Sequence, residues 1–134
     1  MTDFELMQCA VTARKHSYSP YSGFRVGAAL LAKSGKVYTG CNVENAAYTP
    51  TNCAERTAVF KAVSEGEKEF VAIAIVGGKG ENPAEFCAPC GVCRQVLAEF
   101  CDTDFRLLLG TPENIQAFTF ADILPYSFGK SDLK

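Results

Sequence analysis

The sequence contains no tryptophan and no excess of positive charge, and both absences restrict what the protein can bind. Its 134 residues include 13 lysines and arginines against 15 aspartates and glutamates, which gives a net charge of -2. Tight binding to a polyanion depends on clustered positive charge that releases counterions. Binding to a single strand usually adds aromatic side chains on which the bases stack. We therefore expect no nucleic acid as the main partner.

Long apolar runs and a basic leader are lacking as well. The apolar runs, such as those at 71–76 and 107–109, are too short to span a bilayer. The first five residues, Met-Thr-Asp-Phe-Glu, are acidic, whereas a secretory signal begins with a basic segment and continues with an apolar one. We therefore expect a cytoplasmic protein with no membrane partner, whose cysteines stay reduced.

The composition is that of an ordinary globular domain. Hydrophobic residues make up 48% of the chain and charged residues 21%, far from the disordered class. The longest loop-like stretch, at 77–83, is too short to separate two domains. Together with the length, this predicts one domain over residues 1–134.

Hydrophobic periodicity and turn signals predict the order α-β-β-α-β-α-β-β. We expect helices from residue 2 or 3 to before 19, from an Asn52 cap to about 64, from Pro89 through 100, and in a short turn over 121–124. We expect strands near 25–33, 36–43, 71–76, 105–109 and 115–120. The segment 71–76 is continuously apolar, as in a strand covered on both faces. This order predicts an α/β fold, a three-layer α/β/α sandwich around a mixed, roughly five-stranded sheet.

Seven cysteines are many for this length, and three of them begin predicted helices. Cys53 lies in the first turn of one helix, and Cys90 and Cys93 lie three residues apart at the start of another. Helix N-termini favour the thiolate, which is the form that binds metal. If the two helix starts lie side by side at the ends of adjacent strands, three sulfurs can meet in a zinc site.

Other interpretations of the cysteines stay open at this point. The pair Cys90 and Cys93 has the spacing of a redox dithiol, although such motifs usually lie earlier in a βαβ unit. Cys87 also has ligand spacing to Cys90 and would complete a closed, purely structural four-sulfur site. The isolated Cys9, Cys41 and Cys101 are expected to be small buried apolar residues. We favour a metal site with an open position over these alternatives.

Two charged residues, Glu55 and Arg56, follow Cys53 after one alanine. Asn52-x-x-Glu55 resembles a capping box, in which the glutamate binds the amide of the cap residue. Cys53 and Glu55 are about 200° apart around a regular helix, so the carboxylate reaches a metal-bound water only if it bends past the helix end. Arg56 shares a face with Cys53, where a guanidinium would offset the charge of three thiolates on zinc. On spacing alone, Arg56 could equally be an exposed surface arginine.

These residues resemble a known family, the small, homotetrameric, zinc-dependent type of cytidine deaminase. The resemblance rests on Cys-Ala-Glu-Arg-Thr-Ala at 53–58 and on Pro-Cys-Gly-Val-Cys-Arg-Gln-Val at 89–96, which match the zinc-ligand and glutamate pattern of the deaminases. Similar segments extend over nearly the whole chain, at 18–22, 24–30, 40–48, 61–66 and 124–128. Two features depart from the family pattern, namely Val92, where a small alanine is expected, and the stretch 77–88 with its extra Cys87.

The resemblance implies a reaction and a set of residues that perform it. The reaction is the hydrolytic deamination of cytidine and deoxycytidine in pyrimidine salvage, with one Zn2+ per chain held by Cys53, Cys90 and Cys93. Water takes the fourth position on the zinc, and Glu55 transfers protons as base and then acid. The residues implied to contact substrate are Phe24, Asn42, Glu44, Asn45, Ala46, Tyr48 and Ala54.

Some of these contacts have specific roles in the family. Asn42 and Glu44 would hydrogen-bond the ribose hydroxyls, Phe24 would pack against the nucleoside, and backbone near Ala54 would hold the pyrimidine. Phe128 would cover the site of a neighbouring subunit in a homotetramer. Taken singly, these residues have plainer interpretations: a core phenylalanine, a turn asparagine and a solvated glutamate.

Three other functions are weighed against this one. A deaminase for another small cytosine compound, such as the antibiotic blasticidin S, is disfavoured by Glu44 within Asn-Val-Glu-Asn at 42–45. A polynucleotide deaminase is disfavoured by the missing basic segment and tryptophan. A binding module built on structural zinc would hold the metal tightly and perform no chemistry.

Overall fold

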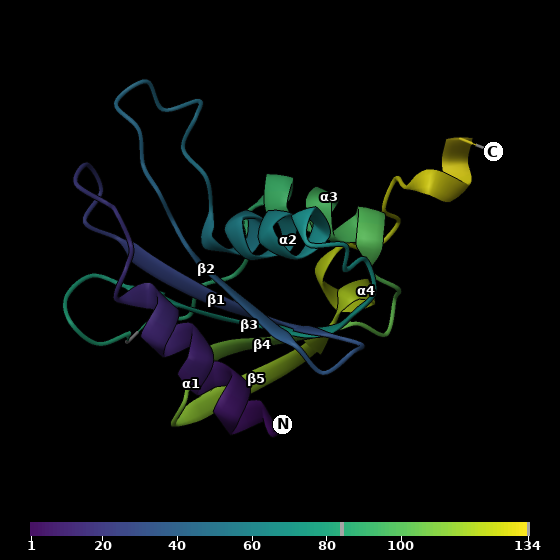
Figure 1. The fold of residues 1–134 in the computed structure, drawn as a ribbon, viewed down its shortest axis with the longest axis horizontal. Helices are drawn as coiled ribbons and strands as arrows, with labels where there is room; N and C mark the ends of the chain where they lie inside the picture. Colours follow the sequence, from purple (N-terminus) through teal and green to yellow (C-terminus); the bar gives the residue numbers. More distant parts are fainter. Residues whose placement is uncertain (84, 134) are drawn as a thin grey trace.

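Strand β3 (Phe70–Gly78) forms the centre of the fold, because its residues from Ala72 onward are buried on both faces of a sheet. The computed structural model describes residues 1–83 and 85–133. The sheet has five strands in the order β2-β1-β3-β4-β5 (Figure 1). The other strands are β1 (Arg25–Ala32), β2 (Val37–Cys41), β4 (Arg106–Thr111) and β5 (Asn114–Thr119). Only β3 and β4 pair in parallel, so the sheet is mixed, as the sequence predicts.

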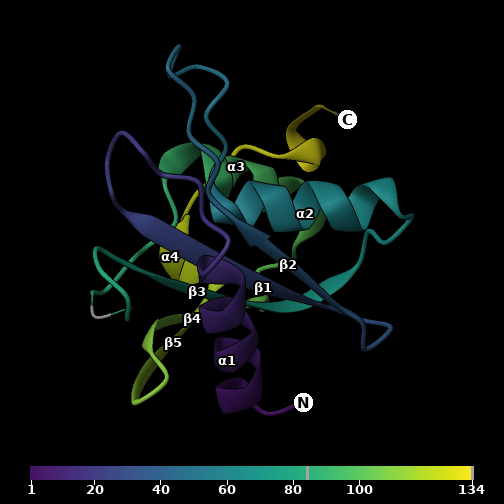
Figure 2. The same cartoon turned by 60° about the vertical axis from the view of Figure 1, so that its left-hand side comes forward.

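Helices cover both faces of this sheet and complete a three-layer α/β/α sandwich. They are α1 (Asp3–Arg14), α2 (Ala54–Ser64), α3 (Gly91–Phe100), the short α4 (Phe120–Ile123) and a 3-10 turn, η1 (Lys130–Leu133). Helix α1 lies on one face, and α2 and α3 lie side by side on the other (Figures 1 and 2). The predicted fold class is therefore confirmed.

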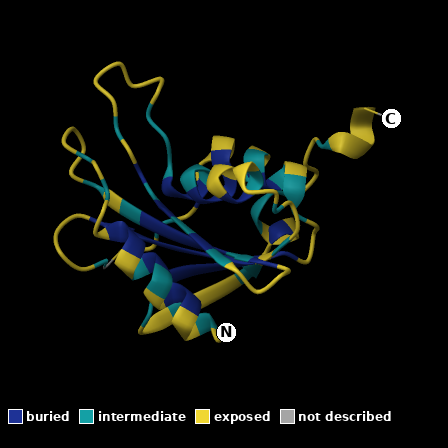
Figure 3. Ribbon diagram, in the orientation of Figure 1, coloured by how far each residue is buried: buried dark blue, intermediate teal, exposed yellow. Residues whose placement is uncertain are grey.

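Each face of the sheet has its own apolar core. The core under α1 is built from that helix and the facing sides of β1, β3 and β4: Leu6, Met7, Ala10, Ala29, Ala72, Ala74, Val76 and Leu108. The core under α2 and α3 is larger and includes Ala58, Val59, Ala62, Ile73, Ile75, Leu97, Leu107 and Leu109. Buried residues fill the central strands of the sheet, whereas β5 and the tips of the long loops are largely exposed (Figure 3). Burial of these side chains supplies the main driving force for folding.

Two glycines let the helices approach the sheet closely. A Cβ on Gly27 would lie 2.1 Å from the Ala10 carbonyl oxygen of α1, and one on Gly40 would lie 2.6 Å from the Ala54 carbonyl oxygen of α2. Real Cβ atoms do not tolerate such contacts with backbone. Both helices are therefore seated on β1 and β2 at glycine positions, which fixes where their ends lie relative to the sheet.

Two helix starts differ from the sequence prediction by one residue or more. Cys53 is the N-cap of α2, whereas Asn52 was predicted, and the Asn52 amide donates to the Thr57 hydroxyl at 3.1 Å. The capping box that Asn52-x-x-Glu55 resembles, which was the alternative role for Glu55, is therefore absent. Cys90 is the N-cap of α3, so Pro89 precedes the helix rather than opening it. In both helices the N-cap residue is therefore a cysteine.

Helix α1 ends at Arg14, and a turn through residues 15–17 follows it. The helix therefore ends before Ser19, as the sequence predicts. Within the described residues, no helix is long and apolar enough to cross a membrane.

Candidate active site

The N-termini of α2 and α3 bring three cysteines together, although they are far apart in the sequence. Cys53 and Cys90 are the N-cap residues of the two helices, and Cys93 lies in the first turn of α3. The Sγ atoms of Cys53 and Cys90 are 3.7 Å apart, and those of Cys90 and Cys93 are 3.5 Å apart. All three sulfurs lie within 4.8 Å of one another. The structure thus gathers the three sulfurs that the sequence singled out.

The spacing of these sulfurs fits a zinc ion. Zinc–sulfur bonds of about 2.3 Å at tetrahedral angles place neighbouring sulfurs about 3.8 Å apart. The observed separations of 3.7 and 3.5 Å are close to that value. Neither N-cap side chain makes a capping hydrogen bond, so these sulfurs do not serve the helix backbone.

Cys87 does not belong to this group among the residues that the structure describes. Its sulfur packs against β3, where a Cβ on Gly77 would lie 2.9 Å away from it. Burial raises the pKa of the Cys87 thiol to about 12, so it stays a neutral thiol. The closed four-sulfur site is therefore not the arrangement seen. Cys9, Cys41 and Cys101 are partly buried and also lie outside the group.

Glu55 is buried in the first turn of α2, two residues after Cys53. Only 4% of its surface is exposed, and its neighbour Ala54 is fully buried. Burial raises the pKa of the Glu55 carboxyl to about 7, and negative charge at Cys53 acts in the same direction. A carboxyl group with a pKa near neutrality can both accept and donate a proton. The arrangement is therefore suited to general acid–base work beside the three sulfurs.

Arg56 supplies positive charge to the sulfur cluster. Its Nη2 donates to the Cys53 sulfur at 3.3 Å, so it is not the exposed surface arginine that spacing alone allowed. A hydrogen bond from the Cys93 thiol, together with the Arg56 guanidinium, lowers the pKa of Cys53 to about 5. The same hydrogen bond raises the pKa of Cys93. A thiolate at Cys53 is therefore stabilised by its surroundings, as a metal ligand requires.

Asn42 and Phe24 lie together at the end of the β1–β2 pair. The Asn42 amide nitrogen donates to the Phe24 carbonyl at 2.8 Å, and its oxygen accepts from the Val26 amide at 2.9 Å and from the Ser17 hydroxyl. Asn42 is buried, and these bonds join β1 to the loops beside it. One N–H of its side-chain amide is left to reach a ligand.

Glu44 lies at the edge of an open cavity of about 260 Å³. The lining residues are Tyr21, Ser22, Glu44, Asn45, Tyr48 and Thr51. The Glu44 carboxylate accepts hydrogen bonds from the backbone amides of Tyr21 and Ser22 at 3.0 and 3.1 Å and from the Ser22 hydroxyl. These bonds, led by that of the Ser22 side chain, lower the pKa of Glu44. The carboxylate is therefore ionised and positioned to accept hydroxyl donors.

The predicted contacts Asn45, Ala46 and Tyr48 lie in a loop that extends from the body of the molecule (Figures 1 and 2). Backbone hydrogen bonds between Val43 and Asn52, at 3.0 and 2.9 Å, close the base of this loop. Ala46 is exposed and does not line the cavity, whereas Asn45 and Tyr48 do. The loop is therefore available to a ligand or to a second chain.

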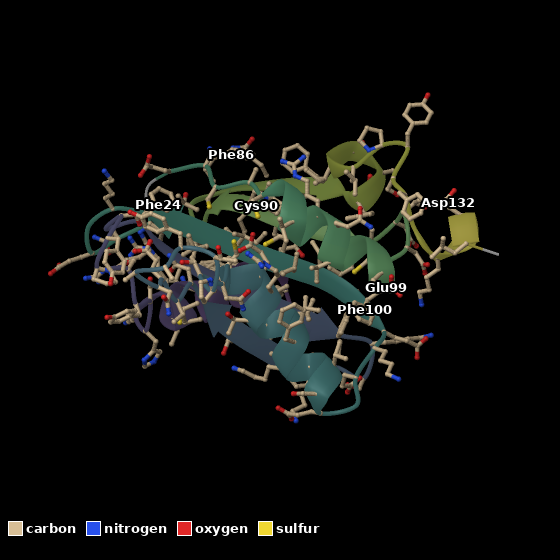
Figure 4. All side chains as sticks on the ribbon, turned by 90° about the horizontal axis from the view of Figure 1, so that it is seen from above. Phe24, Phe86, Cys90, Glu99, Phe100 and Asp132 are labelled. Carbon is tan, nitrogen blue, oxygen red and sulfur yellow. The ribbon has the colours of Figure 1, made fainter. Side chains whose placement is uncertain are left out.

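Phe128 lies away from the cavity in the C-terminal segment. It is exposed, and its carbonyl accepts from the Gln95 side chain at 2.9 Å. Phe24, Phe86 and Cys90 lie in one half of the molecule, whereas Glu99, Phe100 and Asp132 lie in the other (Figure 4). Two larger cavities, of about 370 and 550 Å³, open in that second half, and no predicted site residue lines them.

Sequence reasoning missed residues whose role depends on the loops. Tyr21 and Ser22 hold Glu44, and Arg94 donates to the Pro89 carbonyl at 2.8 Å and to the Ile123 carbonyl at 2.7 Å. Arg94 thereby fixes the residue before Cys90 to the C-terminal part of the chain. Ser22 and Arg94 both lie within the segments on which the resemblance rests, which was the available signal.

A comparison with family models identifies the class of protein. Residues 1–108 match the cytidine and deoxycytidylate deaminase zinc-binding region, which covers the sulfur cluster and Glu55. The chain therefore belongs to the cytidine and deoxycytidylate deaminase family of enzymes.

Individual relatives narrow the comparison to one kind of deaminase. The chain is 52% identical to a cytidine deaminase of Sporosarcina psychrophila, over 90% of this chain and 87% of the relative. It is 50% identical to a cytidine deaminase of Halalkalibacterium halodurans, over 96% and 95%. Among solved structures, a cytidine deaminase from Burkholderia pseudomallei matches with a TM-score of 0.87 and 44% identity, over 96% of this chain and all of that one.

Proposed function

We propose that the protein catalyses the zinc-dependent hydrolytic deamination of cytidine and deoxycytidine to uridine and deoxyuridine, with release of ammonia. The observation that carries this proposal is the buried Glu55 carboxyl beside three sulfurs that lie within 4.8 Å of one another. Names of the relatives support the choice of nucleoside. We further propose that each chain holds one zinc ion through Cys53, Cys90 and Cys93, and that the enzyme serves pyrimidine salvage in the cytoplasm.

In this reaction zinc would activate water, and residues of the chain would transfer the protons. Zinc at this site supplies Lewis acidity, which makes water a competent nucleophile near neutral pH. Glu55 accepts one proton from water and delivers it to ring N3 as oxygen adds to C4. It then takes the remaining proton from that C4 hydroxyl and passes it to the amino group, which leaves as ammonia as the C4 carbonyl forms. A single carboxyl group with a pKa near 7 can perform both the basic and the acidic step. Arg56 offsets the negative charge of the thiolates.

Binding of the nucleoside is assigned to the residues that the resemblance implies, of which Glu44, Asn45 and Tyr48 line the cavity. Phe24 packs against the nucleoside, and backbone at Ala54 holds the pyrimidine amide edge. Asn42 and Glu44 bind the ribose hydroxyls, with Asn45, Ala46 and Tyr48 in the loop beside them. The side-chain oxygen of Asn42 already accepts hydrogen bonds within the protein, so Glu44 is the stronger acceptor for these hydroxyls.

The direct test is the loss of ultraviolet absorbance when purified protein is incubated with cytidine. We expect cytidine and deoxycytidine to be consumed, and cytosine, CMP and oligo-dC to be spared. Preference for CMP or for the oligonucleotide would contradict the proposed substrate. Zinc-loaded protein that binds metal but converts none of these compounds would instead be a binding module built on structural zinc.

Replacing Glu44 by alanine should weaken nucleoside binding without affecting the metal. Loss of an ionised acceptor for the ribose hydroxyls is expected to raise the KM for cytidine about tenfold or more, with kcat less affected. Steady-state kinetics and zinc analysis measure the two effects. The Ser22→Ala variant is the matched control, because it removes a donor to Glu44 but keeps the carboxylate. An unchanged KM in Glu44→Ala would refute the assignment.

We also propose that the enzyme is a homotetramer in which Phe128 covers a neighbouring subunit's site. The exposed Phe128 ring and the extended loop around Tyr48 are surfaces that a single chain leaves open. Sedimentation equilibrium should give four times the 14.5 kDa chain mass. The Phe128→Ala variant should keep that mass and lose activity. A fully active monomer would contradict both parts.

A further inference from the structure

Arg14 is a buried arginine whose partners are all backbone carbonyls. It ends α1, and only 2% of its surface is exposed. Its guanidinium donates to the carbonyl oxygens of Arg25 at 3.1 Å, Gly78 at 2.6 Å, Gly80 at 2.8 Å and Glu81 at 2.8 Å. Among residues 1–83 and 85–133, no carboxylate forms an ion pair with it.

This pattern requires the guanidinium group itself. Arginine presents five N–H donors in a planar fork, whereas lysine offers three donors from one flexible point. Four carbonyls on two separate segments are satisfied by one rigid group. Without it, these buried or partly buried carbonyls would lose their partners, and the segments would lose their common attachment.

One of the four carbonyls lies next to Phe24, which is assigned to nucleoside binding, and another lies next to the glycine against which the Phe24 ring packs. Arg25 follows Phe24 directly, and Gly78 follows Gly77. A Cβ on Gly77 would lie 3.0 Å from Cε1 of Phe24 and 2.9 Å from the Cys87 sulfur, so the Phe24 ring and Cys87 both pack at that glycine. Glu85 returns to pair with Gly77 through its amide. Arg14 therefore fixes both segments that meet at Phe24.

The metal centre has a separate attachment. Arg94 holds the Pro89 carbonyl, next to Cys90, and ties it to Ile123. Cys53 lies at the start of α2, which is seated on β2 through Gly40. None of these contacts involves Arg14. Loss of Arg14 should therefore disturb the Phe24 side of the site and leave the three sulfurs in place.

We propose that Arg14 is a positioning residue for nucleoside binding, which holds Phe24 and the segment after β3 in place through four backbone carbonyls. The inference rests on the proposed function, because it concerns how the nucleoside is bound. Arg14 lies in α1, far from the motifs in the sequence, and we expect it to affect the KM specifically.

The test compares Arg14→Gln, Arg14→Lys and the control Arg106→Gln, whose arginine pairs with Asp3 on the surface. We expect Arg14→Gln to raise the KM for cytidine about tenfold, with kcat within about threefold of the original and one zinc per chain. Hydrogen exchange should quicken over 78–82 and 24–26. Arg14→Lys should raise the KM less than Arg14→Gln does, and Arg106→Gln should have the KM of the original protein.

The split between KM and kcat separates positioning from stability. A variant that is only less stable contains fewer folded molecules, so apparent kcat falls while KM stays constant. An unchanged KM in folded Arg14→Gln would overturn the proposal. If that variant does not fold, an unchanged KM in Arg14→Lys would overturn it instead. If the original protein has no activity, the proposed function fails, and unchanged exchange over 78–82 in the Arg14 variants would still refute the role of Arg14.

Discussion

Replacing Glu55 by glutamine is expected to lower kcat for cytidine by about a hundred- to ten-thousandfold, the range that positioned acid–base groups contribute. Glutamine has nearly the same shape but cannot accept and return a proton. Because Cys53 and not Asn52 is the N-cap of α2, no capping box depends on the Glu55 side chain. The change should therefore leave the helix and the sulfur cluster intact.

Steady-state kinetics measure this effect, with zinc analysis and thermal unfolding as controls for the metal and the fold. The KM for cytidine should change much less than kcat, since Glu55 acts on protons that move during the reaction. A Glu55→Gln protein that is folded, holds zinc and turns over normally would show that the carboxylate is not the proton-transfer group.

Replacing Cys90 by serine should remove both the zinc and the activity. Disturbing only the groups around metal ligands already costs about ten- to a hundredfold in affinity or activity, so loss of a ligand should cost more than about a hundredfold. Serine is itself a favoured N-cap residue, and Cys90 is the N-cap of α3, so the helix should persist. Treatment of the unmodified protein with a chelator should reproduce the loss, and added Zn2+ should restore activity.

Cys9→Ser is the matched control for this experiment. Cys9 is a partly buried cysteine of α1 that lies outside the sulfur cluster. The Cys9→Ser variant should keep one zinc per chain and full activity. Equal loss of zinc in the Cys9 and Cys90 variants would mean that the metal is not held where the three sulfurs meet.

The sequence predicts the elements of this fold better than their arrangement. Period and turn residues place strands near 25–33, 36–43 and 71–76, and the structure has them at Arg25–Ala32, Val37–Cys41 and Phe70–Gly78. The order β2-β1-β3-β4-β5 is set by pairing between residues distant in the chain, such as Ala29 with Ala74, and no local pattern encodes it. The starts of α2 and α3 lie later than predicted, because Cys53 and Cys90 have the extended backbone of a cap residue.

The residues of the candidate site could likewise be predicted better than their arrangement. Spacing and the predicted helix starts indicated the three cysteines but left Cys87 as a possible fourth ligand. The separations of 3.5 and 3.7 Å from Cys90 to the other two sulfurs depend on two helix starts meeting in space. Spacing could not decide between a capping role and a buried carboxyl for Glu55, because that depends on which residue caps α2. Nor could it assign Arg14 or Ser22, because their partners are backbone groups and a carboxylate of distant segments.

The open metal site can be tested directly by X-ray absorption at the zinc edge of freshly purified, active protein. We expect three sulfur neighbours at about 2.3 Å and one lighter oxygen or nitrogen neighbour at about 2.0 Å. Four sulfurs around the metal would mean that the site is closed, and active protein without zinc would mean that the three thiolates serve another purpose. Either result would contradict the mechanism in which Glu55 acts beside an open metal position.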